Sequence, residues 1–380
     1  MASGAPARPP MDLSDVRRHH LSLVLEHLAR NGPRSRAALA QETGLTKSTV
    51  SALVGDLLAR DLVEELDTPR AGRVGRPSVD VGVAGRGLGA LGLAIDVDSV
   101  AACVVDVTGD VRVTRRRNAA NRDARASQVV ARLRTVTARA VDAAARLGIR
   151  CIGATLALPG LVDATSRTLF VAPNLHWFDA DLGALRGDLR LPSELPIAVD
   201  NEANLGALAE LRHGAGRDLS SFVYVSAGVG VGAGVVVDGR ILRGAHGFAG
   251  ELGHVVVDPD GRRCACGARG CLETVIGADR DATLEHAADA LAVALRSVVH
   301  LVDPEAVVLG GSLTAYGDTL AARVEDRLHA TTLGARWHPC TVHLSTVGSD
   351  APLFGAATAA LDTVLADPTL VPPRVSSRSA

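Results

Sequence analysis

The segment GFAGELGHVVVDPDGRRCACGARGCLE, residues 247–273, places one histidine and three cysteines close together, in the pattern His254-x9-Cys264-x-Cys266-x4-Cys271. Imidazole and thiolate groups with no carboxylate among them suit tetrahedral Zn²⁺. A lone cysteine usually packs in a hydrophobic core, but three within eight residues beside a histidine indicate a metal site. Four protein ligands close the coordination shell, so we expect one structural zinc ion per chain rather than a centre that activates water.

The overall composition is that of a globular chain with more than one domain. Its 380 residues are long for a single domain. The net charge of −2 gives no global attraction to nucleic acid, and the 2% aromatic content disfavours a platform for stacking single-stranded bases. No apolar run approaches the roughly 20 residues of a membrane span, and residues 1–10 lack the apolar core of a signal peptide. We therefore expect a cytoplasmic protein without a membrane segment.

The first part of the chain predicts a winged helix-turn-helix domain. Apolar spacing and end signals predict helices over 14–30, 36–43 and 46–60, then two strands, at 62–63 and 79–83, around a basic glycine-rich loop. In such a domain the helix over 46–60 lies in the major groove of DNA, and arginines on the wing reach the minor groove. The alternative is a small helical dimerisation module. The expected DNA contacts are Thr46, Lys47, Ser48, Thr49 and Ser51 on the helix, and Arg73 and Arg76 on the wing.

From residue 87 the pattern changes to an α/β body made of two similar halves. Residues 90–115 and 220–242 each alternate β-branched runs with Gly-Asp or Asp-Gly turns, and helical sequence follows each, at 126–147 and 276–301. Two lobes of this kind would enclose a cleft. The expected organisation is a disordered tail over 1–10, a winged helix-turn-helix domain over 11–86, a two-lobed domain over 87–367 and a disordered tail over 368–380.

Several motifs give the body a resemblance to a known family. They are Leu158-Pro159-Gly160, Ala172-Pro173-Asn174, Asn201-Glu202-Ala203-Asn204 and Asp303-Pro304-Glu305 with Gly310-Gly311, besides the segment 247–273. Over about residues 90–365 the chain closely resembles the ROK family of repressors, uncharacterised reading frames and sugar kinases. The resemblance implies an α/β actin-like fold of the hexokinase type, with two lobes and a sugar in the cleft. The N-terminal domain resembles the one that ROK repressors carry and ROK kinases lack.

The resemblance also implies roles for the residues that match the family's motifs. His254 and the three cysteines match its zinc ligands. Family kinases hold sugar hydroxyls with an Asn-Asp pair, with the signature glutamate and histidine, and with the glutamate after the last cysteine. The matching sugar-binding residues here are Asn201, Glu202, Glu251, His254 and Glu273. The alternative is that these five are ordinary surface polar groups and salt-bridge partners.

Two departures from the kinase pattern argue against catalysis. The aspartate of the Asn-Asp pair is the kinases' general base, and Glu202 stands in its place; a misplacement of about 1 Å can cost on the order of 10²-fold in rate. The kinase sequence Asp-x-Gly-Gly-Thr, which lets ATP phosphates approach the backbone, reads Asp96-Val97-Asp98-Ser99-Val100, and Asp98 would repel phosphate. The glycine repeat over 228–234 is a weak candidate for a phosphate loop. We therefore expect no catalytic residues and no enzymatic activity.

These features favour a sugar-responsive DNA-binding transcriptional regulator that represses carbohydrate metabolism genes. Its expected partners are double-stranded operator DNA, a sugar or sugar derivative, and further copies of the chain in a homodimer or higher homo-oligomer. Closure of the lobes would change the spacing of two winged helices and hence operator affinity. Two alternatives remain open. One is an ATP-dependent sugar kinase with a fused DNA-binding domain; the other is a zinc-stabilised scaffold that binds neither sugar nor ATP, which Glu251, His254 and Glu273 together disfavour.

Overall fold

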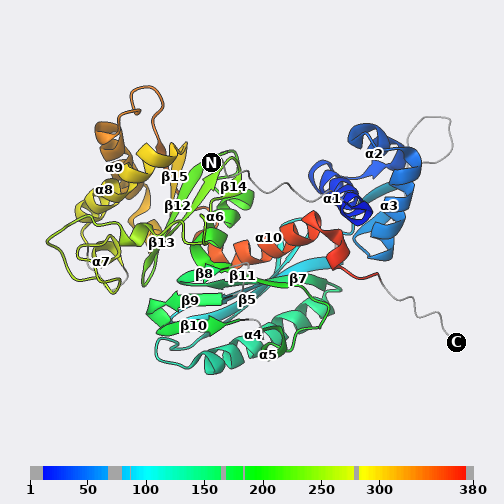
Figure 1. Ribbon diagram of the computed structural model, residues 1–380, viewed down its shortest axis with the longest axis horizontal. Helices are drawn as coiled ribbons and strands as arrows, with labels where there is room; N and C mark the ends of the chain where they lie inside the picture. The colour runs from blue at the N-terminus through cyan, green and yellow to red at the C-terminus, as the bar shows by residue number, and fades with distance from the viewer. Residues whose placement is uncertain are drawn as a thin grey trace, which may run out of the picture.

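A small N-terminal module lies beside a two-lobed body in the computed structural model (Figure 1). The structure describes residues 12–66, 79–85, 87–163, 168–182, 185–277 and 282–373. No helix within these ranges is long and apolar enough to cross a membrane.

The N-terminal module contains the three helices that the sequence predicts. They are α1 (Leu13–Asn31), α2 (Arg36–Thr43) and α3 (Lys47–Ala59), beside a sheet of β1 (Arg34–Ser35), β3 (Asp80–Val83) and β2 (Val63–Leu66) in that order. Helix α3 begins after Thr46, whose side chain accepts a hydrogen bond from the backbone N–H of Thr49. The sequence does not predict β1, because two residues are too few to show alternation. The wing residues Arg73 and Arg76 lie outside the described residues.

Each lobe of the body is built on a five-stranded sheet with the same topology. The strand orders are β11-β7-β4-β5-β6 in the first lobe and β14-β13-β12-β15-β16 in the second. In each sheet three strands form an antiparallel meander. Two strands that come later in the sequence extend the sheet beside the first strand of the meander and run parallel to it. This confirms the two-lobed α/β body and the repeated meander that the sequence predicts.

The first lobe combines its main sheet with a small sheet on one side. The main sheet contains β4 (Leu88–Ile95), β5 (Ser99–Asp106), β6 (Val111–Asn118), β7 (Arg150–Leu158) and β11 (Ile197–Asn201), with α4 (Ala126–Arg146) against it. The small sheet has the order β10-β9-β8 and contains β8 (Leu161–Asp163), β9 (Thr168–Ala172) and β10 (Trp177–Asp181), with the 3-10 helix η1 (Pro173–Leu175) and the short α5 (Leu185–Asp188) nearby.

The second lobe differs from the sequence prediction in its helices. Its strands are β12 (Phe222–Ala227), β13 (Val231–Val237), β14 (Arg240–Ile241), β15 (Ala306–Gly311) and β16 (Thr341–Leu344). Its helices are η2 (Leu252–His254), α7 (Glu273–Ile276), α8 (Leu284–Val302), η3 (Ser312–Tyr316), α9 (Gly317–Thr331) and η4 (Gly348–Asp350). The single helix expected over 276–301 is wrong at its start, because the side chain of Thr283 caps α8 by accepting from the N–H of His286.

Two helices cross between the lobes. Helix α6 (Glu202–His213) follows β11 of the first lobe and packs on β12 and β13 of the second. Helix α10 (Ala351–Ala366) follows β16 of the second lobe and packs on β4 and β7 of the first. They touch at Leu205 and Gly355, where any side chain on residue 355 would overlap the Leu205 carbonyl oxygen. The backbones of the two helices are therefore in direct contact.

The N-terminal module shares a hydrophobic core with the first lobe. Leu25 and Leu28 of α1 belong to the same buried cluster as Leu361 and Val364 of α10. The chain after α10 forms the 3-10 helix η5 (Pro368–Leu370) and then buries Val371 in this cluster. The expected disordered tail therefore begins too early at 368, because the residues that follow α10 find apolar cover against the module.

Candidate functional site

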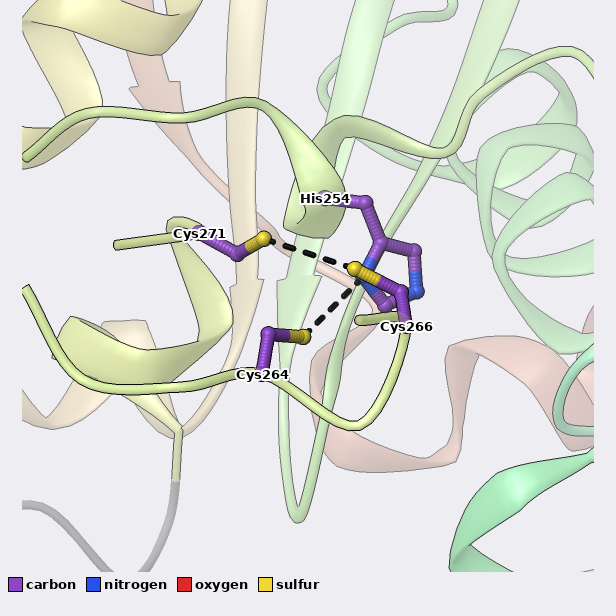
Figure 2. Close-up of side chains that lie close together, drawn as sticks. All are labelled: His254, Cys264, Cys266 and Cys271. Carbon is purple, nitrogen blue, oxygen red and sulfur yellow. Dashed lines mark hydrogen bonds between the residues drawn. The ribbon is translucent and has the colours of Figure 1, made fainter. Parts of the chain in front are cut away.

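The histidine and three cysteines of the segment 247–273 converge in the second lobe (Figure 2). One ligand atom from each of His254, Cys264, Cys266 and Cys271 lies within 4.8 Å of the others. The Sγ of Cys264 is 3.6 Å from Nδ1 of His254, and the Sγ atoms of Cys266 and Cys271 are also 3.6 Å apart. Three soft sulfur ligands and one imidazole in a closed cluster are the donor set of a structural zinc site.

The local fold explains why the chain can wrap so tightly around this cluster. His254 ends η2, and the cysteines lie on the turns between η2 and α7. Gly270 has a φ of 66°, and a side chain there would overlap the carbonyl oxygen of Asp258. The pKa of the Cys266 thiol is lowered, chiefly by the backbone N–H of Ala268, which favours the thiolate form that a metal requires.

A cavity of about 530 Å³ lies next to the cluster and is lined by residues of both lobes. Its volume is in the range of roughly 300–1,000 Å³ that small-molecule sites occupy. All five predicted sugar-binding residues line it: Asn201, Glu202, Glu251, His254 and Glu273. Residues far apart in the sequence are thus brought together around one cavity.

His254 stands between the metal cluster and the cavity. Its Nδ1 faces the Sγ of Cys264, while its Nε2 lies 3.8 Å from a carboxylate oxygen of Glu251. Glu273 lies against the same cluster, with its Oε1 3.0 Å from the Sγ of Cys264 and 3.6 Å from Nδ1 of His254. One imidazole nitrogen is thus directed to the metal ligands and the other to the cavity.

The structure limits what Asn201 can offer a ligand. Its Oδ1 caps α6 by accepting from the backbone N–H groups of Ala203 and Asn204, at 2.7 and 3.3 Å. Its Nδ2 donates to the carbonyl oxygen of Gly160 at 2.8 Å. One amide hydrogen remains for the cavity, so Asn201 is chiefly a residue that positions the start of α6.

Glu202 lies in the first turn of α6 and interacts electrostatically with Asp96, and these two residues directly follow β11 and β4 of the first-lobe sheet. Burial, and secondly the negative charge of Asp96, raise the pKa of Glu202 to about 8. A carboxyl group with this pKa is mostly protonated at neutral pH, so it can donate a hydrogen bond to a ligand in the cavity. Burial likewise raises the pKa of Glu251, while the charge of His254 opposes this shift.

The two segments considered as phosphate loops have local contacts within the fold. In the turn between β4 and β5, Asp98 is exposed, and Ser99 is buried with its hydroxyl accepting from Arg116 at 3.1 Å. In the glycine repeat, Gly232 and Gly234 let β13 pack closely on α6, since a side chain on Gly234 would overlap the Ala203 carbonyl oxygen. Gly230 instead lines the cavity, where a side chain would meet Asn174 and Glu273.

The predicted site residues do not include four side chains that also line the cavity and could contact a ligand: Asn174, His176, Phe178 and Phe248. Asn174 belongs to the motif Ala172-Pro173-Asn174, which is the signal that could have identified it. The two phenylalanines give no such signal, because a sequence does not show which aromatic side chains are left exposed.

The predicted DNA-contacting residues occupy the start of α3. Lys47, Ser48 and Ser51 are exposed there. The Thr46 hydroxyl instead bonds to the hydroxyls of Ser48 and Thr49, at 2.9 and 2.8 Å. Thr46 and Thr49 therefore stabilise the N-terminal end of α3, which Thr46 caps, while Lys47 and Ser51 face solvent.

Comparisons with known proteins agree with this architecture. The sequence profile of the ROK family matches residues 90–280 and 277–363, and that of the MarR family matches residues 22–74. The xylose repressor of Bacillus subtilis is 31% identical over 266 residues, which cover 69% of this chain and 67% of the repressor. A glucokinase of Halalkalibacterium halodurans is 30% identical over 248 residues, which cover 54% of this chain and 74% of the glucokinase. The crystal structure of a ROK family transcriptional regulator, a homolog of the E. coli MLC protein, has a TM-score of 0.77 and 25% identity, covering 93% of this chain and 98% of its own.

Proposed function

The chain belongs to the ROK family and carries a MarR-type winged helix DNA-binding domain, and from this premise we propose that it is a repressor of carbohydrate metabolism genes that responds to a sugar in its cleft. One observation carries the proposal: a cavity lined by two imidazoles, two amides and three glutamates lies in a body that packs directly against a DNA-binding module. The named xylose repressors among its relatives, and the regulator whose structure spans 93% of this chain, support it.

In this proposal the polar groups of the cavity pair with sugar hydroxyls. Glu251 and Glu273 accept, the Nε2 side of His254 and the amide of Asn201 each supply one further bond, and the protonated Glu202 donates. Each buried group that loses its partner costs about 1–3 kcal/mol, so such a site distinguishes sugars by the placement of single hydroxyls.

We assign one structural zinc ion per chain to His254, Cys264, Cys266 and Cys271, on the strength of their geometry and donor chemistry. When bound, the ion fixes the ring of His254 and holds the turns that precede α7. It needs no open coordination position for this role.

At the other end of the molecule, α3 enters the major groove of an operator, with Lys47, Ser48 and Ser51 toward the bases and Thr46 and Thr49 at the helix start. Arg73 and Arg76 of the wing contact the minor groove or its phosphates. A homodimer would place two such helices on two half-sites of the operator.

The second candidate is an active sugar kinase, which the glucokinase relatives favour. We propose that the chain has no such activity, because Glu202 holds its proton near neutral pH and the turn at Asp98 offers a carboxylate where phosphates would bind. A coupled assay of ADP release over hexoses and pentoses distinguishes the two, and turnover on the order of 1 s⁻¹ would establish the kinase.

The direct test is sugar binding by the full chain. Isothermal titration with a panel of free and phosphorylated sugars should find a ligand, and Glu251→Ala should abolish its binding while leaving zinc content and sugar-free operator binding intact. His254→Ala should lower both zinc retention and sugar binding. Glu285→Ala, an exposed glutamate on α8, is the matched control. Sugar binding by Glu251→Ala as strong as that of the wild type would show that the sugar site lies elsewhere.

A further inference from the structure

Three exposed phenylalanines gather around the cavity of this chain. The whole sequence has five Phe, two Tyr and two Trp residues. Phe170, Phe178 and Phe248 nevertheless expose 38%, 67% and 39% of their surface, and we call them the aromatic rim. Phenylalanine is among the residues most often buried in proteins, so three exposed at one place mark a binding surface.

The aromatic rim is continuous with the proposed sugar site. Phe178 on β10 and Phe248 on the loop after β14 line the same cavity as Glu251 and Glu273. Phe248 also lines an adjoining cavity of about 700 Å³, which it shares with Phe170 of β9. Each cavity alone is in the size range of a complete small-molecule site, and Phe248 forms part of the wall of both.

The ring of Phe248 is fixed in place. Phe170 meets it edge-to-face, with 5.4 Å between ring centroids and 89° between ring planes. Its loop is tied down by a hydrogen bond of 3.1 Å from the N–H of Ala233 to the carbonyl oxygen of Gly250. A side chain at Gly250 would overlap the Ala233 carbonyl oxygen, so the loop also lies flush on β13. A fixed ring loses little conformational entropy when a ligand covers it.

Polar groups surround the adjoining cavity. The guanidinium of Arg243 pairs with Asp200 at 2.6 Å, and the ring of His246 lies 6.2 Å from that of Phe248. Asp163 lines the same space. Aromatic faces flanked by carboxylate, guanidinium and imidazole groups suit a sugar ring, because a pyranose presents apolar C–H groups on its face and hydroxyls on its edge.

We propose that the effector is a glycoside of at least two sugar rings. The first ring lies among Glu251, His254 and Glu273, and the second lies on the aromatic rim against Phe178 and Phe248. This inference rests on the proposed function, since it extends the same sugar site. Phe178 belongs to the first lobe and Phe248 to the second, so a second ring would contact both lobes and favour one relative arrangement of them.

The test compares sugars of two sizes on the full-length protein. Titration calorimetry with xylose, xylobiose, glucose, cellobiose and maltose should show a disaccharide that binds at least about tenfold more tightly than its own monosaccharide, a difference of about 1.4 kcal/mol. Phe178→Ala and Phe170→Ala should each remove most of this gain. Phe170 lines the adjoining cavity and not the one that holds the first ring, so Phe170→Ala should change monosaccharide affinity by no more than about twofold. Trp337→Ala is the matched control, because Trp337 is an exposed aromatic side chain that lines neither cavity.

The outcomes separate this inference from the function it extends. Monosaccharide binding that depends on Glu251, without tighter binding of any disaccharide, would leave the repressor proposal intact and overturn the two-ring effector. Disaccharide affinity that is unchanged in both phenylalanine variants would also overturn the two-ring effector. The aromatic rim would then be better explained as a contact surface for a protein partner. If no sugar of either size binds the wild type, both proposals fail.

Discussion

At the scale of single residues, His254 belongs both to the candidate metal cluster and to the lining of the cavity. Its Nδ1 lies 3.6 Å from the Sγ of Cys264, and its Nε2 lies 3.8 Å from a carboxylate oxygen of Glu251, three residues earlier in the chain. A metal on one nitrogen fixes the orientation and tautomer of the ring, and thereby the group that the other nitrogen presents. The proposed zinc site and the proposed sugar site would therefore depend on each other through this one ring.

The thiol of Cys266 gives the sharpest test of the metal site. Cys266→Ser should lower zinc content from about one ion per chain to a small fraction, because an alcohol is a much weaker ligand than a thiolate. It should also lower the melting temperature, since metal binding contributes to folding. Cys151→Ser, a cysteine of the first lobe outside the cluster, should keep its zinc. Metal analysis of freshly purified, unchelated proteins measures both, and wild-type protein without zinc would refute the site.

The carboxyl of Glu202 predicts how stability changes with pH. Its pKa is about 8 in the folded chain and near 4.5 when unfolded, so between these values the folded state holds a proton that the unfolded state has released. Its contribution to stability is complete below pH 4.5 and is lost as pH rises toward 8, by at most about 1.4 kcal/mol per pH unit. Glu202→Gln cannot ionise and should become more stable relative to the wild type as pH rises. Calorimetric melting temperatures at pH 5.5, 7 and 8.5 measure this, with the exposed Glu64→Gln as control; parallel curves for wild type and Glu202→Gln would contradict it.

At the scale of elements, the sequence predicts what local patterns encode. Apolar spacing and capping residues predict α1, α2, α3 and α4 almost to their ends, and the Asp238-Gly239 turn predicts the hairpin of β13 and β14. The break between α7 and α8 and the burial of Val371 escape prediction, because each depends on contacts with distant parts of the chain. The candidate metal ligands could be predicted because, like the residues of the turn, they lie close together in the sequence. The aromatic rim could not be predicted, because the fold brings its residues together from distant parts of the chain.

The exposed start of α3 should determine operator binding. Lys47→Ala in the full chain should weaken binding by about 1–3 kcal/mol and relax base preference at one position if the lysine reads a base edge. If it contacts a phosphate, the loss should instead be uniform across sequences, with a shallower salt dependence. Band-shift titrations over a range of salt concentrations distinguish the two. Arg336→Ala, an exposed arginine in the second lobe, should bind the operator as the wild type does, and undiminished binding by Lys47→Ala would exclude α3 as the recognition helix.

At the scale of the whole molecule, a continuous set of packed elements joins the cavity of about 530 Å³ to the N-terminal winged helix module. Helix α6 starts at the cavity, with Asn201 as its cap, and touches α10 at Leu205 and Gly355. At its other end, buried Glu210 accepts a hydrogen bond from the Val347 N–H at 3.2 Å, just before α10. Helix α10 then packs against α1 of the DNA-binding module. A change in the lobes at the cavity thus has a physical route to the winged helix (Figure 1).

Arg60 connects the DNA-binding module to the body of the protein through hydrogen bonds. It follows α3, and its guanidinium donates to the carbonyl oxygens of Thr369 and Val371, while its own carbonyl accepts from Arg150 of β7 at 2.8 Å. These bonds tie the end of the recognition helix to the body. Arg60→Ala should therefore leave sugar affinity without DNA nearly unchanged and reduce the factor by which the sugar changes operator affinity, a factor typically between about 5 and 150 for allosteric proteins.

Thermodynamic linkage makes this prediction testable from both ends. The operator must change sugar affinity by the same factor as the sugar changes operator affinity, so both factors should fall together in Arg60→Ala. Band shifts with and without sugar give the first factor, and titration calorimetry with and without operator gives the second. Arg30→Ala removes an arginine of the same module that pairs only within α1, with Glu26, and should keep both factors. Wild-type coupling in Arg60→Ala would show that the signal does not need the Arg60 side chain and passes through other contacts between module and body, such as the shared apolar core of α1 and α10.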